Sequence, residues 1–302
     1  MHDDLVMQIA ILIEDECEYK GDSLLDYTCL WDGSLYSEGI SKGLDAYKNQ
    51  TIEYLYFGNE FCEYRIPSVE QLSKMNILCH KEKLKLVLVT PPVSDYGIER
   101  VKRLINYISQ KNIELDIVVN DVGVLEIIHQ RNKKLSLIAG RIFDKTSHDS
   151  RATMKAFNQY YGENGMKFAK TPGVISRYAR EIYERYGVIR YEFDMPMIGL
   201  ELPSNGYFSL YWPYNYLTTG RICLLRSMDL KGTNKFLVEE KKCSQPCVKY
   251  KVEKRKPING YGDLCGNRKR ELLLTQKGNT VFYLNDSCSC DLSSFDRLVV
   301  QL

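Results

Sequence analysis

The sequence predicts one α/β domain over residues 1–302, a (β/α)8 barrel of the TIM type that is irregular or incomplete and carries a Cys-rich C-terminal insertion. The chain length and a hydrophobic content of 44% are sufficient for one large core. Apolar runs alternate with amphipathic segments roughly every 25 to 30 residues, the spacing of linked βαβ units. About eight such runs favour a closed barrel over an open sheet, and no GxGxxG or phosphate-loop motif indicates a nucleotide-binding α/β fold.

The strand predictions rest on short runs of β-branched, aromatic and other apolar residues. The clearest runs are 7–13, 52–57, 85–90, 114–119 and 135–139. Weaker candidates are 166–170, 189–193, 207–212 and 295–300. Several of the clear runs are apolar nearly throughout, as expected of parallel strands that are buried on both faces.

Helices are predicted between these runs from apolar residues at helical spacing. Residues 96–111 place one apolar stripe on a helix, composed of Ile98, Val101, Leu104, Ile105 and Ile108. Residues 122–131 and 174–186 show similar patterns, and Thr171-Pro172-Gly173 is a start signal for the second of them.

Two segments depart from a regular barrel. Residues 16–50, rich in Asp, Ser, Gly and Tyr, form a long connection with a weak helical pattern at 39–48. Residues 223–292 are rich in Cys and Lys and contain a predicted β-hairpin over 271–284, with its turn at 276–279. Both segments are expected to lie outside the repeating strand–helix units.

The last strand candidate ends almost at Leu302, which leaves no sequence for a helix to cover it. We therefore expect Leu298, Val299, Val300 and Leu302 to be partly exposed and to form an interface with a partner, either a related subunit or a second copy. The alternative is that residues 16–50 fold back over this strand.

Composition excludes several classes of protein. Forty-one Lys and Arg against 39 Asp and Glu give a net charge of +2, which is no strong signal for nucleic-acid binding. No apolar run approaches the roughly 18 residues of a membrane span, and the N-terminus shows no secretory signal. We expect a cytoplasmic protein.

Ten cysteines are the anomaly of the composition. In a chain of this length without a visible signal peptide, metal or cluster binding is favoured over a disulfide framework. Cys243 and Cys247 are separated by three residues, and 19 residues lie between Cys223 and Cys243. Cys62 follows a predicted strand and is therefore expected at the C-terminal mouth of the barrel. These four cysteines could hold an iron–sulfur cluster or a structural zinc ion, because both take four protein ligands in closed sites.

The remaining cysteines are assigned more modest roles. Cys17, Cys29 and Cys79 are expected to be packing thiols. Cys265, Cys288 and Cys290 could form a second metal site, and Cys265 could replace one ligand of the first; the sequence leaves their roles open.

Charged residues at strand ends are the candidates for chemistry. Glu60, Asp121 and Arg141 each follow a predicted strand, and barrels keep their catalytic groups there. The alternative for Glu60 is a rim ion pair with Arg65. His148 could face the mouth, although a helix start at the neighbouring Ser and Asp is the favoured interpretation.

Several of these segments together resemble the collagenase-like peptidase family U32. They comprise the surroundings of Cys62, residues 120–124, 139–141, 217–223, Cys243 to Cys247 with Lys249-Tyr250, and 282–285. The resemblance runs from about residue 50 to the C-terminus, and its closest members are the small iron–sulfur proteins of oxygen-independent ubiquinone hydroxylation. It implies a barrel-like fold in which Cys62, Cys223, Cys243 and Cys247 hold a [4Fe–4S] cluster.

The resemblance implies a redox enzyme, or a subunit of one, in oxygen-independent hydroxylation or a related modification of an organic substrate. It also points to a related partner subunit. The alternatives are a non-enzymatic subunit stabilised by an Fe–S cluster or by zinc, and a peptidase on the strength of the family name alone. The sequence contains no HExxH zinc-protease motif.

Overall fold

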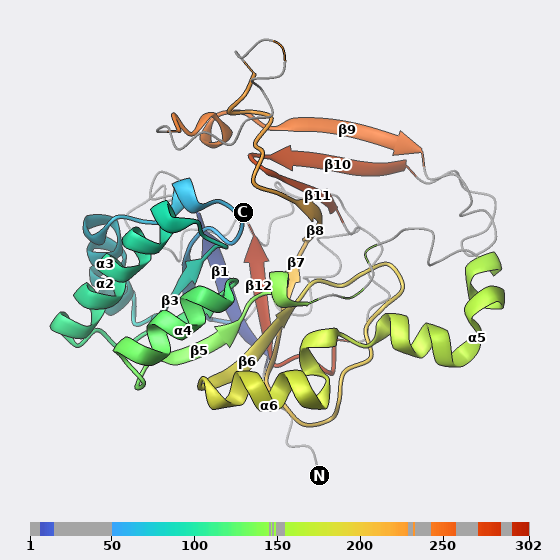
Figure 1. The fold of residues 1–302 in the computed structure, drawn as a ribbon, viewed down its shortest axis with the longest axis horizontal. Helices are drawn as coiled ribbons and strands as arrows, with labels where there is room; N and C mark the ends of the chain where they lie inside the picture. The colour runs from blue at the N-terminus through green and yellow to red at the C-terminus, as the bar shows by residue number, and fades with distance from the viewer. Residues whose placement is uncertain are drawn as a thin grey trace.

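The computed structural model describes residues 7–14, 50–144, 146, 148, 155–228, 232, 243–257, 271–284 and 292–301. Its centre is a closed barrel of eight parallel strands in the order β1-β12-β7-β6-β5-β4-β3-β2 (Figure 1). The strands are β1 (Gln8–Ile13), β2 (Ile52–Gly58), β3 (Lys85–Thr90), β4 (Asp116–Val119), β5 (Ser136–Ala139), β6 (Val188–Phe193), β7 (Phe208–Trp212) and β12 (Arg297–Gln301). The predicted barrel class is confirmed.

Eight of the nine strand candidates form the barrel, and the ninth is wrong. Residues 166–170 are the last turn and a half of helix α5 (Lys155–Lys170). The Met-Lys-Phe start of this run alternates apolar and polar residues as a strand does, but Met, Lys and Ala are all good helix formers. Phe168 is 84% exposed on this helix, so the alternation reflects no buried face.

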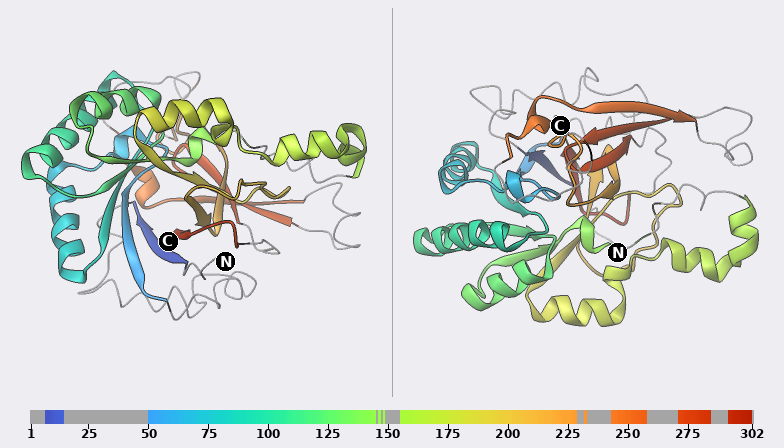
Figure 2. Two further views of the ribbon diagram at one scale, coloured as in Figure 1. Left: turned by 90° about the horizontal axis from the view of Figure 1, so that it is seen from below. Right: turned by 45° about the horizontal axis from the view of Figure 1, so that its top comes forward.

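Helices follow four of the eight strands within the described residues, which makes the barrel incomplete as predicted. They are α2 (Val69–Glu82), α3 (Asp95–Lys111), α4 (Val122–Arg131) and, after β5, α5 and α6 (Arg177–Arg185). Helix α2 was not predicted, although Ser68 and Gln71 form a capping box at its start. The helix predicted over 174–186 is split into a 3-10 turn, η7 (Gly173–Ile175), and α6. Figures 1 and 2 show α5 projecting away from the barrel.

Side chains alternate between the inside of the barrel and the layer under the helices. The outer cluster includes Ile9, Leu55 and Leu104, whereas a separate inner cluster includes Ala10, Tyr56 and Val118. Polar groups also enter the interior, because Arg297 on β12 donates hydrogen bonds to Gln8 and to the Tyr56 hydroxyl.

The insertion between β7 and β12 builds a second sheet beyond the carboxyl ends of the barrel strands (Figure 1). It is antiparallel in the order β8-β11-β10-β9. Its strands are β8 (Tyr214–Thr219), β9 (Val252–Pro257), β10 (Glu271–Lys277) and β11 (Thr280–Leu284). The predicted hairpin is confirmed as β10 and β11, with Gly278 at the turn in a left-handed conformation, φ +65°. The sheet begins at Tyr214, before the predicted boundary at residue 223.

The expectation of an exposed last strand is wrong. Leu298, Val299 and Val300 are 1%, 0% and 0% exposed. Strand β12 lies between β1 and β7, so it is an internal strand of a closed sheet. Leu298 and Val300 join the outer cluster and Val299 the inner one. The structural reason for a partner at this strand is therefore removed, while Leu302 lies outside the described residues.

The long connection predicted over 16–50 lies outside the described residues except for Gln50. None of the helices in the described ranges combines the length and the apolar character needed to cross a membrane.

Candidate functional site at the barrel mouth

The structure brings together the four cysteines singled out from the sequence. Cys62 follows β2, Cys223 follows β8, Cys243 is the first residue described after the 233–242 gap, and Cys247 lies in the 3-10 turn η9 (Pro246–Val248). All four line one cavity of about 230 Å³ at the mouth of the barrel. Segments far apart in the chain therefore converge on one thiol-lined space.

The loop after β2 is shaped to hold Cys62 in this position. The Asn59 side-chain oxygen accepts hydrogen bonds from the backbone N–H of Phe61 at 3.0 Å and of Cys62 at 2.7 Å. Gly58 has φ +127°, and any Cβ there would collide with the Val89 carbonyl oxygen. Only glycine takes this conformation without strain, so the strand end and the Asx turn together fix the loop.

Backbone N–H groups point at three of the four sulfurs. The N–H of Gln245 donates to Cys243 Sγ at 3.3 Å and that of Arg226 to Cys223 Sγ at 3.4 Å. A backbone hydrogen bond from Tyr64 lowers the pKa of Cys62 in the same way. Hydrogen bonds to sulfur stabilise the thiolate form and tune the potential of a thiolate-bound cluster.

Burial works against free thiolates at this site. Desolvation, together with the other three cysteines, raises the pKa of Cys62 to about 12 despite the Tyr64 bond. Desolvation likewise raises the pKa of Cys223 and of Cys247. Burial therefore disfavours free thiolates at these three cysteines, and binding a cationic centre would release their protons.

Positive side chains surround the thiols. Arg65 is 6% exposed, lines the cavity and lowers the pKa of Cys247. Its Nη1 donates to Glu14 Oε2 at 2.7 Å, and Lys277 of the hairpin lies 2.8 Å from the same oxygen. Burial alone would raise the pKa of Glu14, but Lys277 and Arg65 lower it to about 2. This ion pair network joins the end of β1, the Cys62 loop and the hairpin.

The cavity wall carries two further arginines. Arg221 and Arg226 both line it, and the Arg226 guanidinium lies 4.6 Å from the Tyr64 ring centroid. A four-thiolate cluster carries net negative charge, which nearby guanidinium groups stabilise.

The two candidate centres need different spacings of their four sulfurs. A single Zn²⁺ ion needs its four sulfurs within about 4 Å of one another, because each Zn–S bond is about 2.3 Å long. Within the described ranges, no three His, Cys, Asp or Glu side chains are arranged to hold one metal ion. A [4Fe–4S] cubane spreads its thiolates to about 7 Å. Four thiols that line one cavity, three of them with backbone N–H donors, fit the four-thiolate ligand set that such a cluster takes.

Glu60 and Arg141 meet in a buried ion pair network rather than at an open catalytic site. They are 2% and 1% exposed. Arg141 donates through Nε and Nη2 to the Glu60 carboxylate and through Nη1 to Asp194 Oδ1 at 2.5 Å. Its guanidinium lies 3.8 Å from the Tyr211 ring centroid. The rim ion pair considered between Glu60 and Arg65 does not form, since Arg141 occupies the Glu60 carboxylate.

Asp121 is the N-cap of α4. Its Oδ1 accepts from the N–H groups of Gly123 at 2.7 Å and Val124 at 3.1 Å, and its Oδ2 accepts from Val93 at 3.2 Å. Oδ1 therefore caps α4, whereas Oδ2 ties this helix start to the loop after β3.

Two further buried acids, Asp194 and Glu192 of the β6 segment, were not predicted from the sequence. Glu192 is 0% exposed, accepts from the Tyr211 hydroxyl at 2.7 Å, and has a pKa that burial raises to about 8. The alternation of residues 190–194, Arg-Tyr-Glu-Phe-Asp, indicates these two acids, because it places three charged residues on one face of a barrel strand.

Cys79 is the packing thiol that was predicted, 2% exposed within the outer cluster, with its pKa raised to about 12 by burial. Cys17, Cys29, Cys265, Cys288 and Cys290 lie outside the described residues.

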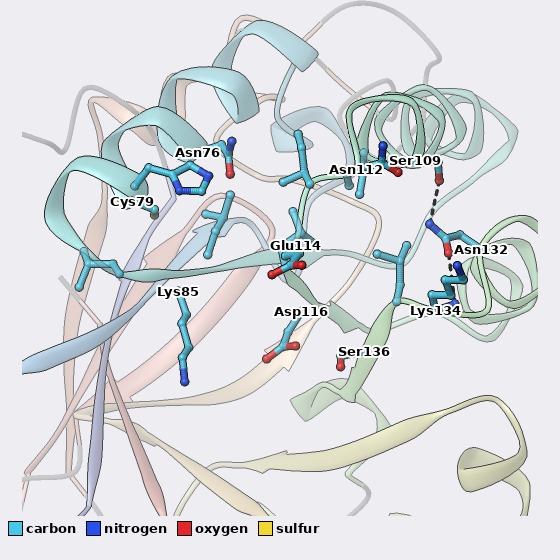
Figure 3. Close-up of a pocket in the computed structure, with 17 residues that line it drawn as sticks. Asn76, Cys79, Lys85, Ser109, Asn112, Glu114, Asp116, Asn132, Lys134 and Ser136 are labelled. Carbon is cyan, nitrogen blue, oxygen red and sulfur yellow. Dashed lines mark hydrogen bonds between the residues drawn. The ribbon is translucent and has the colours of Figure 1, made fainter.

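A second, larger hollow of about 670 Å³ lies at the opposite end of the barrel (Figure 3). Lys85, Asp116 and Ser136 line it from the starts of β3, β4 and β5, together with Glu114 and Asn112 from the loop before β4. Barrel enzymes place their chemistry at the other end, and the hollow contains none of the four clustered thiols.

The fold and the site define this chain as a TIM-like barrel protein with a four-cysteine centre at its mouth. No protein-family model matches the chain, and no curated protein matches it. Among solved structures it is similar to the U32 peptidase Mk0906, with 9% sequence identity, a TM-score of 0.41, and coverage of 100% of this chain and 95% of that chain. At this TM-score the match carries no functional inference.

Proposed function

We propose that the protein is an iron–sulfur protein of the U32 peptidase-like family, in which Cys62, Cys223, Cys243 and Cys247 ligate a [4Fe–4S] cluster. The observation that carries this proposal is the convergence of the four thiols on one cavity at the barrel mouth. The backbone N–H groups aimed at three sulfurs and the three surrounding arginines support it.

The cluster would supply electron transfer or substrate activation at the mouth of the barrel, in oxygen-independent hydroxylation or a related modification of an organic substrate. Arg65, Arg221 and Arg226 would offset its negative charge and raise its potential. The Phe61 ring packs against Tyr216 and Phe282, with centroids 5.3 and 5.5 Å away, and closes the barrel interior beneath the site. The buried ion pairs of Arg141 with Glu60 and Asp194 stabilise the position of these aromatic rings.

Metal analysis with an absorption spectrum after anaerobic purification tests the proposal. We expect about four irons and four sulfides per chain, and a broad band near about 400 nm that bleaches with dithionite. A colourless protein with one zinc ion per chain would refute the cluster and leave the zinc-stabilised subunit. If organic substrates neither reoxidise the reduced cluster nor accelerate its reduction, the non-enzymatic subunit is favoured.

A peptidase function has little support from the described residues. The sequence contains one G-x-S-x-G pentapeptide, Gly39 to Gly43, which lies outside them. In serine hydrolases this motif sits on a sharp strand-to-helix turn beside a His and an acid, so its spacing alone assigns no nucleophile.

A further inference from the structure

Beside the cysteine cavity, two neighbouring side chains bury polar atoms that have no hydrogen-bond partner. Asp144 is 2% exposed; its Oδ1 accepts from the Thr146 N–H at 2.9 Å and from the Thr146 hydroxyl, but its Oδ2 is buried and unpartnered. Both ring nitrogens of His148 are also buried without a partner. Buried polar atoms are nearly always paired in native structures, with protein groups or with bound molecules, so these three atoms of Asp144 and His148 indicate a bound hydrogen-bonding molecule.

Both residues contact Tyr216, His148 through its ring and Asp144 through its backbone carbonyl oxygen. The His148 ring lies 4.9 Å from that of Tyr216, centroid to centroid. The Tyr216 hydroxyl donates to the carbonyl oxygen of Arg141 at 3.2 Å and lies 3.5 Å from that of Asp144. Tyr216 also packs on Phe61, the residue before Cys62. Tyr216 therefore links these two residues to the loop that carries Cys62.

The charge of this corner selects the kind of molecule. Four charged side chains act on the Tyr216 hydroxyl: the carboxylates of Asp194, Asp144 and Glu60, and the guanidinium of Arg141. Arg141 binds both Glu60 and Asp194, which leaves the Asp144 carboxyl as the acidic group of this corner that Arg141 does not bind. Arg141 is already bonded to Glu60, Asp194 and the Tyr214 carbonyl, so an incoming anion would find repulsion and no free donor on it.

We propose that Asp144 and His148 form a binding site for an organic ammonium group. Its N–H donors would satisfy Asp144 Oδ2 and one ring nitrogen of His148. The adjoining faces of Tyr216 and His148 would add cation–π attraction. His148 is half-buried, so part of this residue reaches solvent. This site needs no cluster, so it stands or falls separately from the proposed function.

The test uses n-propylamine, with n-propanol and propionate as neutral and anionic controls of the same chain length. The histidine ring signals of the anaerobically purified protein are followed by NMR during each titration, and His148→Gln identifies the His148 signal. We expect n-propylamine to shift that signal saturably and the two controls to leave it unmoved. Equal shifts with all three compounds, or none with n-propylamine, would overturn the proposal.

Calorimetry on variants locates the binding. Asp144→Asn keeps the oxygen that Thr146 uses and removes the charge, so affinity for n-propylamine should fall by about tenfold or more. Glu114→Gln, in the hollow at the opposite end of the barrel (Figure 3), is the matched control and should bind as wild type. Loss in Glu114→Gln with full affinity in Asp144→Asn would assign the amine to the other hollow and refute the site. Should Asp144→Asn fail to fold, His148→Gln takes its place, and undiminished affinity in it contradicts the proposal.

Discussion

Replacing Arg141 with Met should destabilise the protein by about 3–5 kcal/mol, the usual effect of removing one partner from a buried ion pair. Arg141 is 1% exposed and binds two carboxylates and a carbonyl oxygen. Met keeps much of the packing against Tyr211 but leaves Glu60 and Asp194 without a counter-charge. At the usual 2–4 °C per kcal/mol for chains of comparable size, the melting temperature should fall by roughly 6–20 °C.

The loss should depend on pH. Burial raises the pKa of Glu60 and Arg141 opposes that rise, so removing Arg141 raises the folded-state pKa further above the unfolded value. A group of this kind regains stability as pH falls, because the folded state then binds the proton more readily. The destabilisation of Arg141→Met should therefore be smaller at about pH 5 than at about pH 8.

Urea unfolding followed by the fluorescence of the buried Trp212, 2% exposed, measures both effects. Arg103→Met on the exposed face of α3 is the matched control and should change stability by less than about 0.5 kcal/mol. An Arg141→Met variant within about 1 kcal/mol of wild type, or one equally destabilised at both pH values, would refute the role of this ion pair network in stabilising the site.

Three further outcomes follow from the same geometry. Cys→Ser at positions 62, 223, 243 or 247 should abolish bound iron. Cys79→Ser, in the outer hydrophobic cluster, should keep the iron content of wild type. Equal losses of iron at all five positions would mean general destabilisation. Gly140→Ala should cost about 1–3 kcal/mol, because the added Cβ meets the Asn120 side chain, and a neutral result in urea unfolding would contradict this packing. Glu192→Gln should gain stability over wild type as pH rises from about 5 towards 8. The reason is that the folded-state pKa of Glu192, about 8, lies above its unfolded value. Parallel curves of stability against pH for the two proteins would count against this prediction.

Much of the barrel was predictable because its signals are local. The apolar runs that became β1 to β7 and β12 are continuous in sequence, and the hairpin carries its turn at Gly278. The placement of Cys62 at the mouth followed from one rule about strand ends. These features depend on only a few neighbouring residues.

The partners of the buried charges were not predictable in this way. Glu60 pairs with Arg141, 81 residues away, and not with the nearby Arg65. Which charges meet depends on the barrel's closure, since Arg141 follows β5, Glu60 follows β2 and Asp194 follows β6. The burial of β12 likewise follows from its position between β1 and β7, which no single segment encodes.

The most direct test of the central claim is the Mössbauer spectrum of the protein purified anaerobically from cells grown on ⁵⁷Fe. The account predicts the signal of one [4Fe–4S]²⁺ cluster per chain, lost when Cys62 or Cys247 is replaced by Ser. A chain that carries no iron and one zinc ion, or whose iron signal survives replacement of both cysteines, would contradict it.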